Sequence, residues 1–182
     1  MSDDMRVGLG FDIHRLVRGI PLMLGGLEVE SPVGLEGHSD GDVLLHAVTD
    51  AVLGACGQGD IGDFFPTNDP KWKGRPSEVF LRRALDQADR AGWEVVNVDC
   101  IIVAETPFLG AWKEGIRSSL AGILELPPED VCVKAKTYEG LGPVGQGKAI
   151  ECHAVVLLQS VEDEGGDADG GDRDGDGDDE EE

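Results

Sequence analysis

The stretch DVLLHAVTDAVLGAC, residues 42–56, places its apolar residues at helical spacing. Ser39 or Asp40 is available to cap the start of a helix here, and Gly57 and Gly59 are suited to end it. One face of that helix would pack against a core. The apolar face consists of Leu45, Val48, Val52 and Leu53.

Short segments rich in β-branched residues lie on both sides of this helix and predict strands. They span residues 5–11, 21–30, 94–104, 131–137 and 149–159. The run of apolar residues within 94–104 predicts a strand that is buried on both faces. The 21–30 segment surrounds Gly25 and Gly26 and is expected to form a small hairpin of its own.

Two further helices are expected, at residues 76–91 before Gly92 and at 109–124 before Pro127 and Pro128. The alternation of strands and helices predicts an α/β (α+β) fold, with a mixed sheet of about four strands and helices packed on one face. The other face would remain uncovered in a single chain. We therefore expect subunits to associate through it.

The first two expected helices are separated by DIGDFFPTNDPKWKG, residues 60–74. This segment is polar and contains prolines, and it also holds two adjacent phenylalanines. A loop of this length with no regular structure is usually functional or disordered.

The chain is strongly acidic, with 15 Lys and Arg against 37 Asp and Glu among 182 residues and a formal net charge of −22. Nucleic acid and anionic membrane surfaces are recognised through cationic side chains, so neither is an expected partner. Residues 162–182 contain 13 of the acids and one Arg, with no aromatic or β-branched residue. We expect a single domain at residues 1–161 and a disordered acidic tail at 162–182.

Residues 1–161 still carry a net charge of −10 without the tail. This favours a halophile-like protein adapted to concentrated salt, where screening weakens the repulsion between acids. An ordinary acidic enzyme with an acidic tail is the alternative. The sequence shows no apolar run long enough to cross a membrane and no signal peptide, which predicts a cytoplasmic protein.

The four cysteines are widely spaced, with no C-x-x-C pair for zinc or redox chemistry, and are expected to be small buried hydrophobic residues. They are Cys56, Cys100, Cys132 and Cys152.

Histidine and aspartate occur together in two places that could bind a metal. Asp12 and His14 follow the first strand, two residues apart, so that in an extended segment both would point the same way. His46 lies in the first helix, and the three side chains would suit zinc with an open fourth position. Such spacing also arises by chance, and a single helix histidine is more often packed or exposed. Asp42 and Asp50, one turn on either side of His46, could orient its ring.

Two other segments carry polar groups of possible function. Asp60-Ile61-Gly62 follows the first helix, where it would provide an acid and a flexible backbone N–H near the metal candidates, or simply form a turn. Residues 134–139, KAKTYE, end a strand with two cations, a hydroxyl and a carboxylate. They could hold a phosphate and a second cation, or reflect only the alternation of side chains along a strand.

Four stretches of the chain together resemble a known family. They are GFDIH at 10–14, GHSDGDVLLHAVTDAVLGA at 37–55, GDIGDFFP at 59–66 and NVDCIIVAETP at 97–107. In this order they are similar to the 2-C-methyl-D-erythritol 2,4-cyclodiphosphate synthase family of the non-mevalonate isoprenoid pathway. The likeness extends over about residues 5–159.

The resemblance implies a homotrimer of α/β subunits with three active sites at subunit interfaces. It implies a phosphorus–oxygen lyase that converts 4-diphosphocytidyl-2-C-methyl-D-erythritol 2-phosphate, a cytidine diphosphate-linked small molecule, to the cyclic diphosphate and CMP. Position by position, Asp12, His14 and His46 would bind zinc, and Glu139 would help to hold magnesium or manganese on the diphosphate. His38 and Thr137 would be catalytic and stabilise the transition state. The residues implied to bind substrate are Asp12, His14, His38, Ser39, Asp60, Ile61, Gly62, Phe65, Pro66, Asp69, Lys136, Thr137 and Glu139.

The sequence departs from the family's usual pattern in the nucleotide half of the site. Phe108 stands where a lysine is usual, and Tyr138 interrupts the usual threonines beside Thr137. Pro143 and Gln146 replace a phenylalanine and an arginine that line the trimer's central cavity. Two functions remain open: the synthase with an adapted pocket, in which Lys136 compensates for Phe108, or a metal-binding trimer that binds or acts on another phosphorylated compound.

Overall fold

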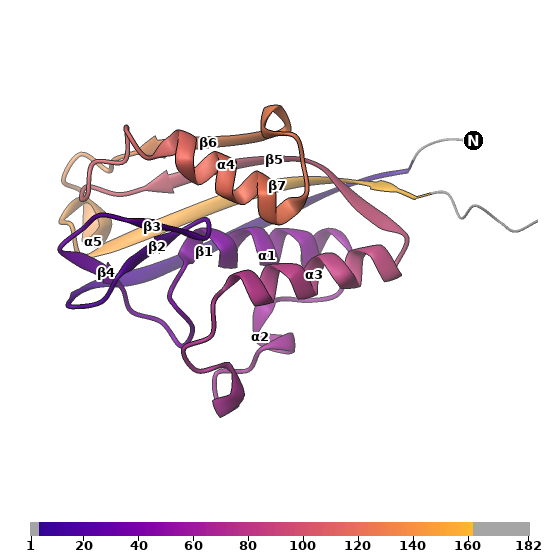
Figure 1. The fold of residues 1–182 in the computed structure, drawn as a ribbon, viewed down its shortest axis with the longest axis horizontal. Helices are drawn as coiled ribbons and strands as arrows, with labels where there is room; N and C mark the ends of the chain where they lie inside the picture. Colours follow the sequence, from indigo (N-terminus) through magenta and orange to yellow (C-terminus); the bar gives the residue numbers. More distant parts are fainter. Residues whose placement is uncertain (1–3, 162–182) are drawn as a thin grey trace, which may run out of the picture.

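The computed structural model describes residues 4–161 (Figure 1). The acidic tail expected at 162–182 lies outside the described residues. The elements follow in the order β1 (Met5–Arg18), β2 (Leu22–Leu24), β3 (Leu27–Val29), β4 (Val33–Leu35), α1 (Val43–Ala55), α2 (Ile61–Phe64), η1 (Pro70–Trp72), α3 (Glu78–Arg90), β5 (Trp93–Val103), α4 (Lys113–Leu124), η2 (Pro128–Asp130), β6 (Val131–Lys136), α5 (Gly142–Gly145) and β7 (Ala149–Ser160).

The mixed sheet has the strand order β4-β1-β7-β5-β6. The four long strands were predicted, whereas β4 was not, so the expected count of about four is one too low. The reason is that β1 continues to Arg18, beyond the predicted end at residue 11, and its last three residues pair with β4. β1 and β7 are antiparallel from Met5 opposite Gln159 to Arg15 opposite Ala149, and β5 and β6 are parallel. β2 and β3 form the separate hairpin that was expected.

Helices α1, α3 and α4 cover one face of the sheet (Figure 1). α1 lies across β1 and β7, and its contact with β1 depends on two glycines. A Cβ on Gly8 would be 1.8 Å from the carbonyl oxygen of Ala51, and a Cβ on Gly10 would be 1.8 Å from that of Ala47. Side chains at these positions would therefore push α1 away from the strand.

The opposite face of the sheet is apolar and open in the single chain. Successive strand residues point to opposite faces, so the residues of β1 that alternate with Gly8 and Gly10 point away from the helices. The exposed apolar side chains on this face are Met5, Val7, Leu9, Phe11, Ile13 and Val155, of which Leu9 is 70% exposed. This uncovered face agrees with the expectation from the sequence.

Strand β5 is fully buried only on its helix-facing side; on the other side Asp99 and Ile101 are half-buried and only Val103, at the strand's end, is buried, which corrects the prediction of burial on both faces. Val98, Cys100 and Ile102 are fully buried against the helices. Asp99, between the first two, points to the other side, where its Oδ2 lies 2.5 Å from the Nζ of Lys134 on β6. Apolar residues at consecutive positions concealed this alternation in the sequence.

The cysteine prediction is partly wrong. Cys100 and Cys152 are fully buried, and burial raises the pKa of the Cys100 thiol to about 12. Cys56 is half-buried, and Cys132 is exposed because its position on β6 points away from the helices. Within residues 4–161, no helix has both the length and the apolarity needed to cross a bilayer.

Candidate metal centre

Asp12 and His14 on β1 meet His46 on α1 at the contact between the strand and the helix. The Oδ2 of Asp12 lies 2.9 Å from the Nε2 of His14 and 2.9 Å from the Nδ1 of His46. The two ring nitrogens are 3.3 Å apart, and one ligand atom from each residue falls within 4.8 Å of the others. The predicted trio is therefore brought together, although Asp12 and His14 lie within β1 and not after it.

The donor set fits a divalent metal such as zinc. Zinc sites in enzymes combine carboxylate oxygen and imidazole nitrogen from three residues and leave one position open. Burial alone would raise the pKa of the Asp12 carboxyl, but hydrogen bonds from His14 and His46 outweigh it and hold that pKa well below its ordinary value. Asp12 is therefore ionised at neutral pH, as a metal ligand must be.

The ring of His14 is oriented by the backbone. Its Nδ1 lies 2.6 Å from the carbonyl oxygen of Glu36, so a proton on Nδ1 would leave Nε2 free to face the metal. A histidine that binds metal through one nitrogen usually donates its other N–H in this way. Gly37 passes next to the ring, since a Cβ there would lie 3.0 Å from its Cε1.

The predicted role of Asp42 and Asp50 is wrong, because the hydrogen bonds of both carboxylates go to backbone N–H groups and not to the His46 ring. Asp42 is fully buried and is the N-cap of α1, in place of the expected Ser39 or Asp40. It accepts hydrogen bonds from the backbone N–H groups of Gly25, Gly26 and Leu45 and so ties the β2–β3 turn to the helix. Asp50 instead accepts a 2.7 Å hydrogen bond from the N–H of Ile61, at the start of α2.

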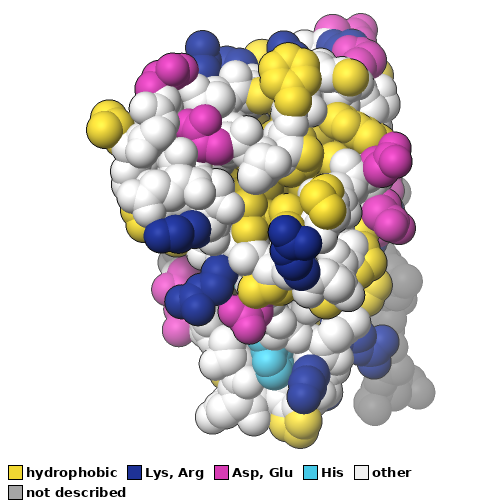
Figure 2. Space-filling view, turned by 90° about the vertical axis from the view of Figure 1, so that its left-hand side faces the viewer, with side chains coloured by type: hydrophobic (Ala, Val, Ile, Leu, Met, Phe, Trp, Pro, Cys, Tyr) yellow, Lys and Arg dark blue, Asp and Glu magenta, His cyan; other side chains and the backbone are white. Residues whose placement is uncertain are grey.

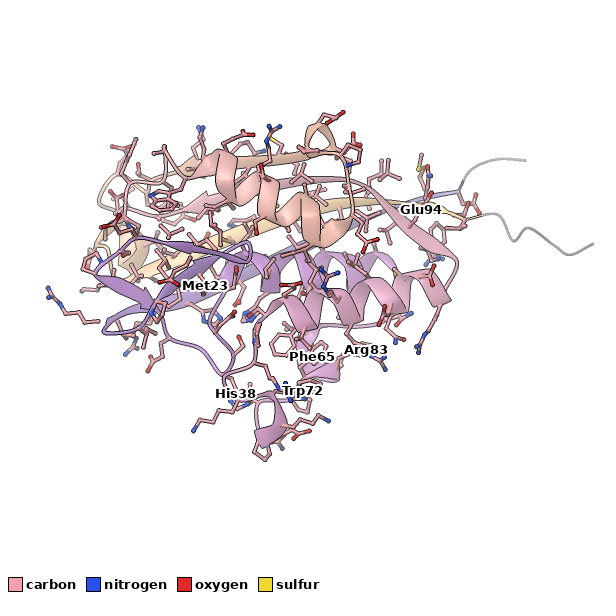
Figure 3. The ribbon with its side chains drawn as sticks, viewed as in Figure 1. Met23, His38, Phe65, Trp72, Arg83 and Glu94 are labelled. Atoms are coloured by element: carbon pink, nitrogen blue, oxygen red, sulfur yellow. The ribbon has the colours of Figure 1, made fainter. Side chains whose placement is uncertain are left out.

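The loop after α1 is structured, with α2 and η1 inside residues 60–74. Phe65 is buried, and its ring centroid lies 4.5 Å from that of Phe80 and 4.9 Å from that of Trp72. The Phe80 ring is in turn 6.0 Å from the ring of His46, so an aromatic cluster connects the loop to the metal candidates; Phe65 and Trp72 of this cluster are labelled in Figure 3. His38 lies beside this loop, with its Nε2 3.4 Å from the carbonyl oxygen of Asp69.

Asp60 and Gly62 lie at the start of α2, exposed to solvent. The Oδ1 of Asp60 accepts hydrogen bonds from the N–H groups of Gly62 and Asp63, and the side chain of Asp63 accepts from the N–H of Asp60. The Asp60 carboxylate is thus fixed by a capping box. Ile61 is partly exposed in this turn and Pro66 is exposed just after it.

Lys136, Thr137 and Glu139 are not part of this cluster in the single chain. Lys136 and Thr137 line a separate cavity of about 350 Å³ where β5 and β6 end. Thr137 donates a 2.6 Å hydrogen bond to Glu139, which has a left-handed backbone with φ of 50°. The Glu105 carboxylate accepts hydrogen bonds from the N–H groups on either side of Glu139 and holds this turn.

Of the positions that depart from the family pattern, Phe108 and Tyr138 lie at this second region, whereas Pro143 lines a different cavity that includes His14. Phe108 lines the same cavity as Lys136 but is 85% exposed, and Lys113 on α4 also lines it. The hydroxyl of Tyr138 donates to Glu151, away from the cavity lining. Gln146 accepts a hydrogen bond from Lys148, and Pro143 is exposed on α5.

The end of the molecule in Figure 2 has an apolar patch bordered by side chains of both charges. Figure 2 shows apolar side chains gathered on this end, with Lys and Arg as well as Asp and Glu side chains around them. Arg15 and Lys148 line a cavity of about 500 Å³ that also includes His14. Cationic side chains are therefore available beside the metal candidates for an anionic substrate.

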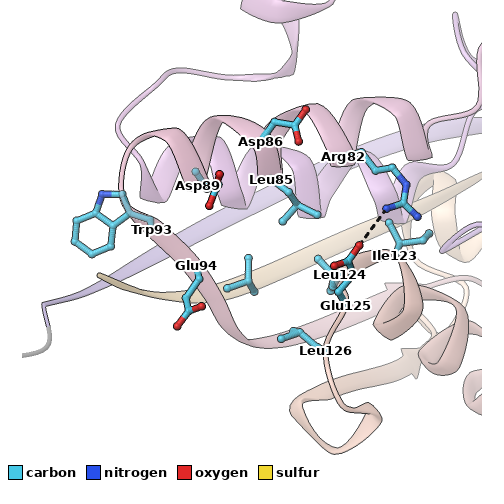
Figure 4. A pocket seen from close by; sticks show the side chains of 12 residues that line it. Arg82, Leu85, Asp86, Asp89, Trp93, Glu94, Ile123, Leu124, Glu125 and Leu126 are labelled. Atoms are coloured by element: carbon cyan, nitrogen blue, oxygen red, sulfur yellow. Dashed lines mark ion pairs between the residues drawn. The ribbon is translucent and has the colours of Figure 1, made fainter. Parts of the chain in front are cut away.

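Another cavity, of about 460 Å³, lies between α3, α4 and the start of β5 (Figure 4). Its rim carries Asp86, Asp89, Glu94 and the Arg82–Glu125 ion pair, in which the Arg82 Nη1 is 3.8 Å from the Glu125 Oε1. It contains none of the residues predicted for the site. An anionic substrate would meet mainly carboxylates there.

Sequence reasoning missed Glu36, Ser77 and Glu105. Each is far along the chain from the predicted residue that it positions. Ser77 faces the His46 ring, the Glu36 carbonyl faces the His14 ring, and Glu105 accepts from the backbone around Glu139. The separation is 31 residues for Ser77 and His46 and 22 for His14 and Glu36. No local spacing pattern carries that information.

Comparison with known proteins agrees with the resemblance seen in the sequence. Residues 5–159 match the YgbB family. A Treponema denticola protein named 2-C-methyl-D-erythritol 2,4-cyclodiphosphate synthase is 51% identical over 154 residues, covering 85% of this chain and 96% of that protein.

Two solved structures share the fold. The bifunctional IspDF from Campylobacter jejuni has a TM-score of 0.85 at 38% identity, covering 88% of this chain. This chain corresponds to only 44% of that longer protein. A complex of Plasmodium falciparum IspF with CDP has a TM-score of 0.76 at 34% identity, covering 89% of this chain and all of the other.

Proposed function

This chain belongs to the YgbB family, and from that premise we propose that it converts 4-diphosphocytidyl-2-C-methyl-D-erythritol 2-phosphate to 2-C-methyl-D-erythritol 2,4-cyclodiphosphate and CMP. The observation that carries the proposal is the convergence of Asp12, His14 and His46 on a common point. The similar proteins that bear the synthase name and the CDP-bound relative support the same substrate class. A 2-phosphate oxygen would attack the diphosphate phosphorus attached to the methylerythritol, forming the P–O–P bond that closes the ring while the P–O–P bond to CMP breaks and CMP leaves, so the reaction class is a phosphorus–oxygen lyase.

The physical difficulty of this reaction is electrostatic. One phosphate of the substrate must attack another, inside a protein with a net charge of −22. Zinc held by Asp12, His14 and His46, with magnesium or manganese near Glu139, would supply the positive charge that polarises phosphorus and neutralises the leaving group. The nucleophile belongs to the substrate, so the protein's own part is alignment, which can lower a barrier by about 7–11 kcal/mol.

The proposed roles of the other residues follow from where they lie. His38 and Thr137 would stabilise the charge that develops on the phosphates, and Ser39 would bind the phosphate nearest to His46. Asp60, Ile61 and Gly62, fixed at the start of α2, would present a carboxylate and backbone groups to the methylerythritol hydroxyls. Phe65, Pro66 and Asp69 belong to the segment that would lie over that end of the substrate.

The nucleotide end of the substrate would bind near Lys136. The cavity beside it has Phe108 where the family usually has lysine, but two cations, Lys113 and Lys136, line it. They could neutralise the diphosphate in place of the missing lysine. The exposed Phe108 ring offers an apolar surface to a base or ribose.

The complete site would require more than one subunit. Glu139, Thr137 and Lys136 are not part of the Asp12 cluster within one chain, and the apolar face of the sheet is uncovered. A homotrimer built on that face would cover it and could bring the second region of one subunit to the metal centre of its neighbour. The uncovered apolar face and the separation of the two regions within one chain support a homotrimer as the working assembly.

The test is to incubate the purified protein with zinc, magnesium and the proposed substrate and to measure CMP and the cyclic diphosphate. Release of both in equal amounts, abolished by a chelator and restored by metal, is expected. The assay should be run at low and at molar KCl because the chain is so acidic. Absence of CMP under both conditions would contradict the proposal and favour a different phosphorylated ligand.

A further inference from the structure

The His46 ring has two chemically different sides. Its Nδ1 faces Asp12 and His14, where the metal would bind. Its Nε2 faces away from them, 2.9 Å from the Oγ of Ser77 and 3.0 Å from the Oγ of Ser39. If Nδ1 gives its lone pair to a metal, the proton of the neutral ring must be on Nε2, directed at these two hydroxyls.

The Ser77 hydroxyl oxygen is held where it can accept a hydrogen bond from the Nε2–H of His46. Its hydroxyl donates to Oδ1 of Asp40, and its backbone N–H donates to Oδ2 of the same carboxylate at 3.1 Å. The Ser77 hydroxyl has a single proton, which it donates in its hydrogen bond to Asp40. The lone pairs of the Ser77 Oγ are therefore left for His46 and for Ser39, whose Oγ is 2.9 Å away.

The usual structural role of a serine at this position is absent. Ser77 is the residue before the first turn of α3, where a serine hydroxyl commonly accepts from a backbone N–H of the helix. In this helix the N-cap side chain makes no such bond. Ser77 is also completely buried, so its hydroxyl is not simply solvated. The Ser77 hydroxyl instead links the Asp40 carboxylate to the His46 ring through hydrogen bonds.

Ser39 is the weaker candidate for the same task. It is only partly buried, its Oγ accepts a 3.2 Å hydrogen bond from the N–H of Gly41, and we have assigned it to the substrate phosphate. A substrate that engages Ser39 would withdraw it from His46. Ser77, behind the ring and out of solvent, would remain in place.

We propose that Ser77 is a positioning residue for the metal centre: anchored by Asp40, it fixes the His46 ring and keeps its proton on Nε2, so that Nδ1 is the metal ligand. This inference rests on the proposed metal at Asp12, His14 and His46. Groups that hold the second nitrogen of a metal-binding histidine typically change metal affinity 10–100-fold when they are removed.

The test compares zinc affinity, measured by competition with a chelator in the absence of substrate, for the full-length protein and three variants. Ser77→Ala should bind zinc about 10–100-fold more weakly, at unchanged stoichiometry. Asp40→Asn should weaken binding in the same direction. Thr49→Val is the matched control: Thr49 is also buried and donates a 2.7 Å hydrogen bond to the Leu45 carbonyl on the same helix, and its hydroxyl is not hydrogen-bonded to the His46 ring. Its zinc affinity should stay within twofold of wild type.

A second measurement separates positioning from loss of stability. In zinc-loaded protein with ¹⁵N-labelled histidine, the Nε2 proton of His46 should be observable and slow to exchange, and Ser77→Ala should lose that protection while the thermal unfolding of its zinc-free form remains cooperative. Unchanged zinc affinity and an unchanged Nε2 signal in Ser77→Ala would overturn the inference. So would an equal loss of affinity in Thr49→Val. If Ser77→Ala does not fold, Asp40→Asn decides by the same two measurements.

The outcomes also distinguish this inference from the proposed function. Wild-type protein that releases CMP and binds zinc, with Ser77→Ala equal to it, would contradict the positioning role alone. Wild-type protein that binds no zinc would contradict both.

Discussion

Gly10 on β1 lies directly against the carbonyl group of Ala47 on α1, so close that a Cβ on Gly10 would be 1.8 Å from that oxygen. The contact is next to the metal candidates in both elements, since Asp12 is two residues beyond Gly10 and His46 is one residue before Ala47. The close approach of strand and helix at this point is therefore what would allow Asp12 and His46 to bind the same metal ion.

Gly10→Ala should destabilise the protein by about 3 kcal/mol, because the new methyl group meets backbone atoms that cannot rotate away. The measurement is the free energy of unfolding by urea, together with zinc affinity, which should fall as α1 is displaced. Gly54→Ala is the matched control on the same helix: nothing lies within 4 Å of a Cβ there. It should be neutral or slightly stabilising. Equal stability of Gly10→Ala and wild type would contradict the packing described.

His46→Ala should lose tight zinc binding and turnover together, because it removes one of the three ligands. Zinc content after dialysis and CMP release are the two measurements. His38→Ala serves as the comparison, since His38 lies beside Asp69 and outside the ligand cluster. It should retain zinc while its turnover falls. Full zinc content in His46→Ala would falsify its role as a ligand.

Leu9→Asp should convert the proposed trimer to monomers. Leu9 is 70% exposed in the centre of the open apolar face, and subunit association would bury the introduced charge. Sedimentation equilibrium gives the mass directly. Val79→Asp, at a 40% exposed apolar residue of α3, is the control and should remain trimeric. A trimeric Leu9→Asp protein, or a monomeric wild type, would show that this face is not the interface.

Molar KCl should raise the free energy of unfolding if the protein is adapted to salt. Residues 1–161 carry a net charge of −10, and the screening length falls from about 10 Å at 0.1 M salt to about 3 Å at 1 M. Urea unfolding at both salt concentrations measures the effect. A variant that lacks residues 162–182 should show the same increase and the same turnover. A flat response in both proteins would indicate an ordinary acidic enzyme.

Element types could be predicted from the sequence because they depend on local periodicity. The stripe of α1 and the β-branched runs of β6 and β7 identified those elements within a few residues. The predictions failed where a distant partner decides the outcome. β1 continues to Arg18 because β4 pairs with its end, and Val95–Val103 alternates between two faces that its apolar residues do not distinguish.

Residue types alone determined that this chain is acidic, contains alternating strands and helices, and carries a carboxylate and two imidazoles suited to a metal. Only the tertiary structure decided the direction of each polar group. Asp42, adjacent to His46 along the helix surface, turns instead to the Gly25–Gly26 backbone, whereas Ser77, 31 residues from His46, contacts its ring. The reason is that a buried polar side chain takes the partner that packing brings within hydrogen-bonding distance, and packing joins segments that are far apart in the chain.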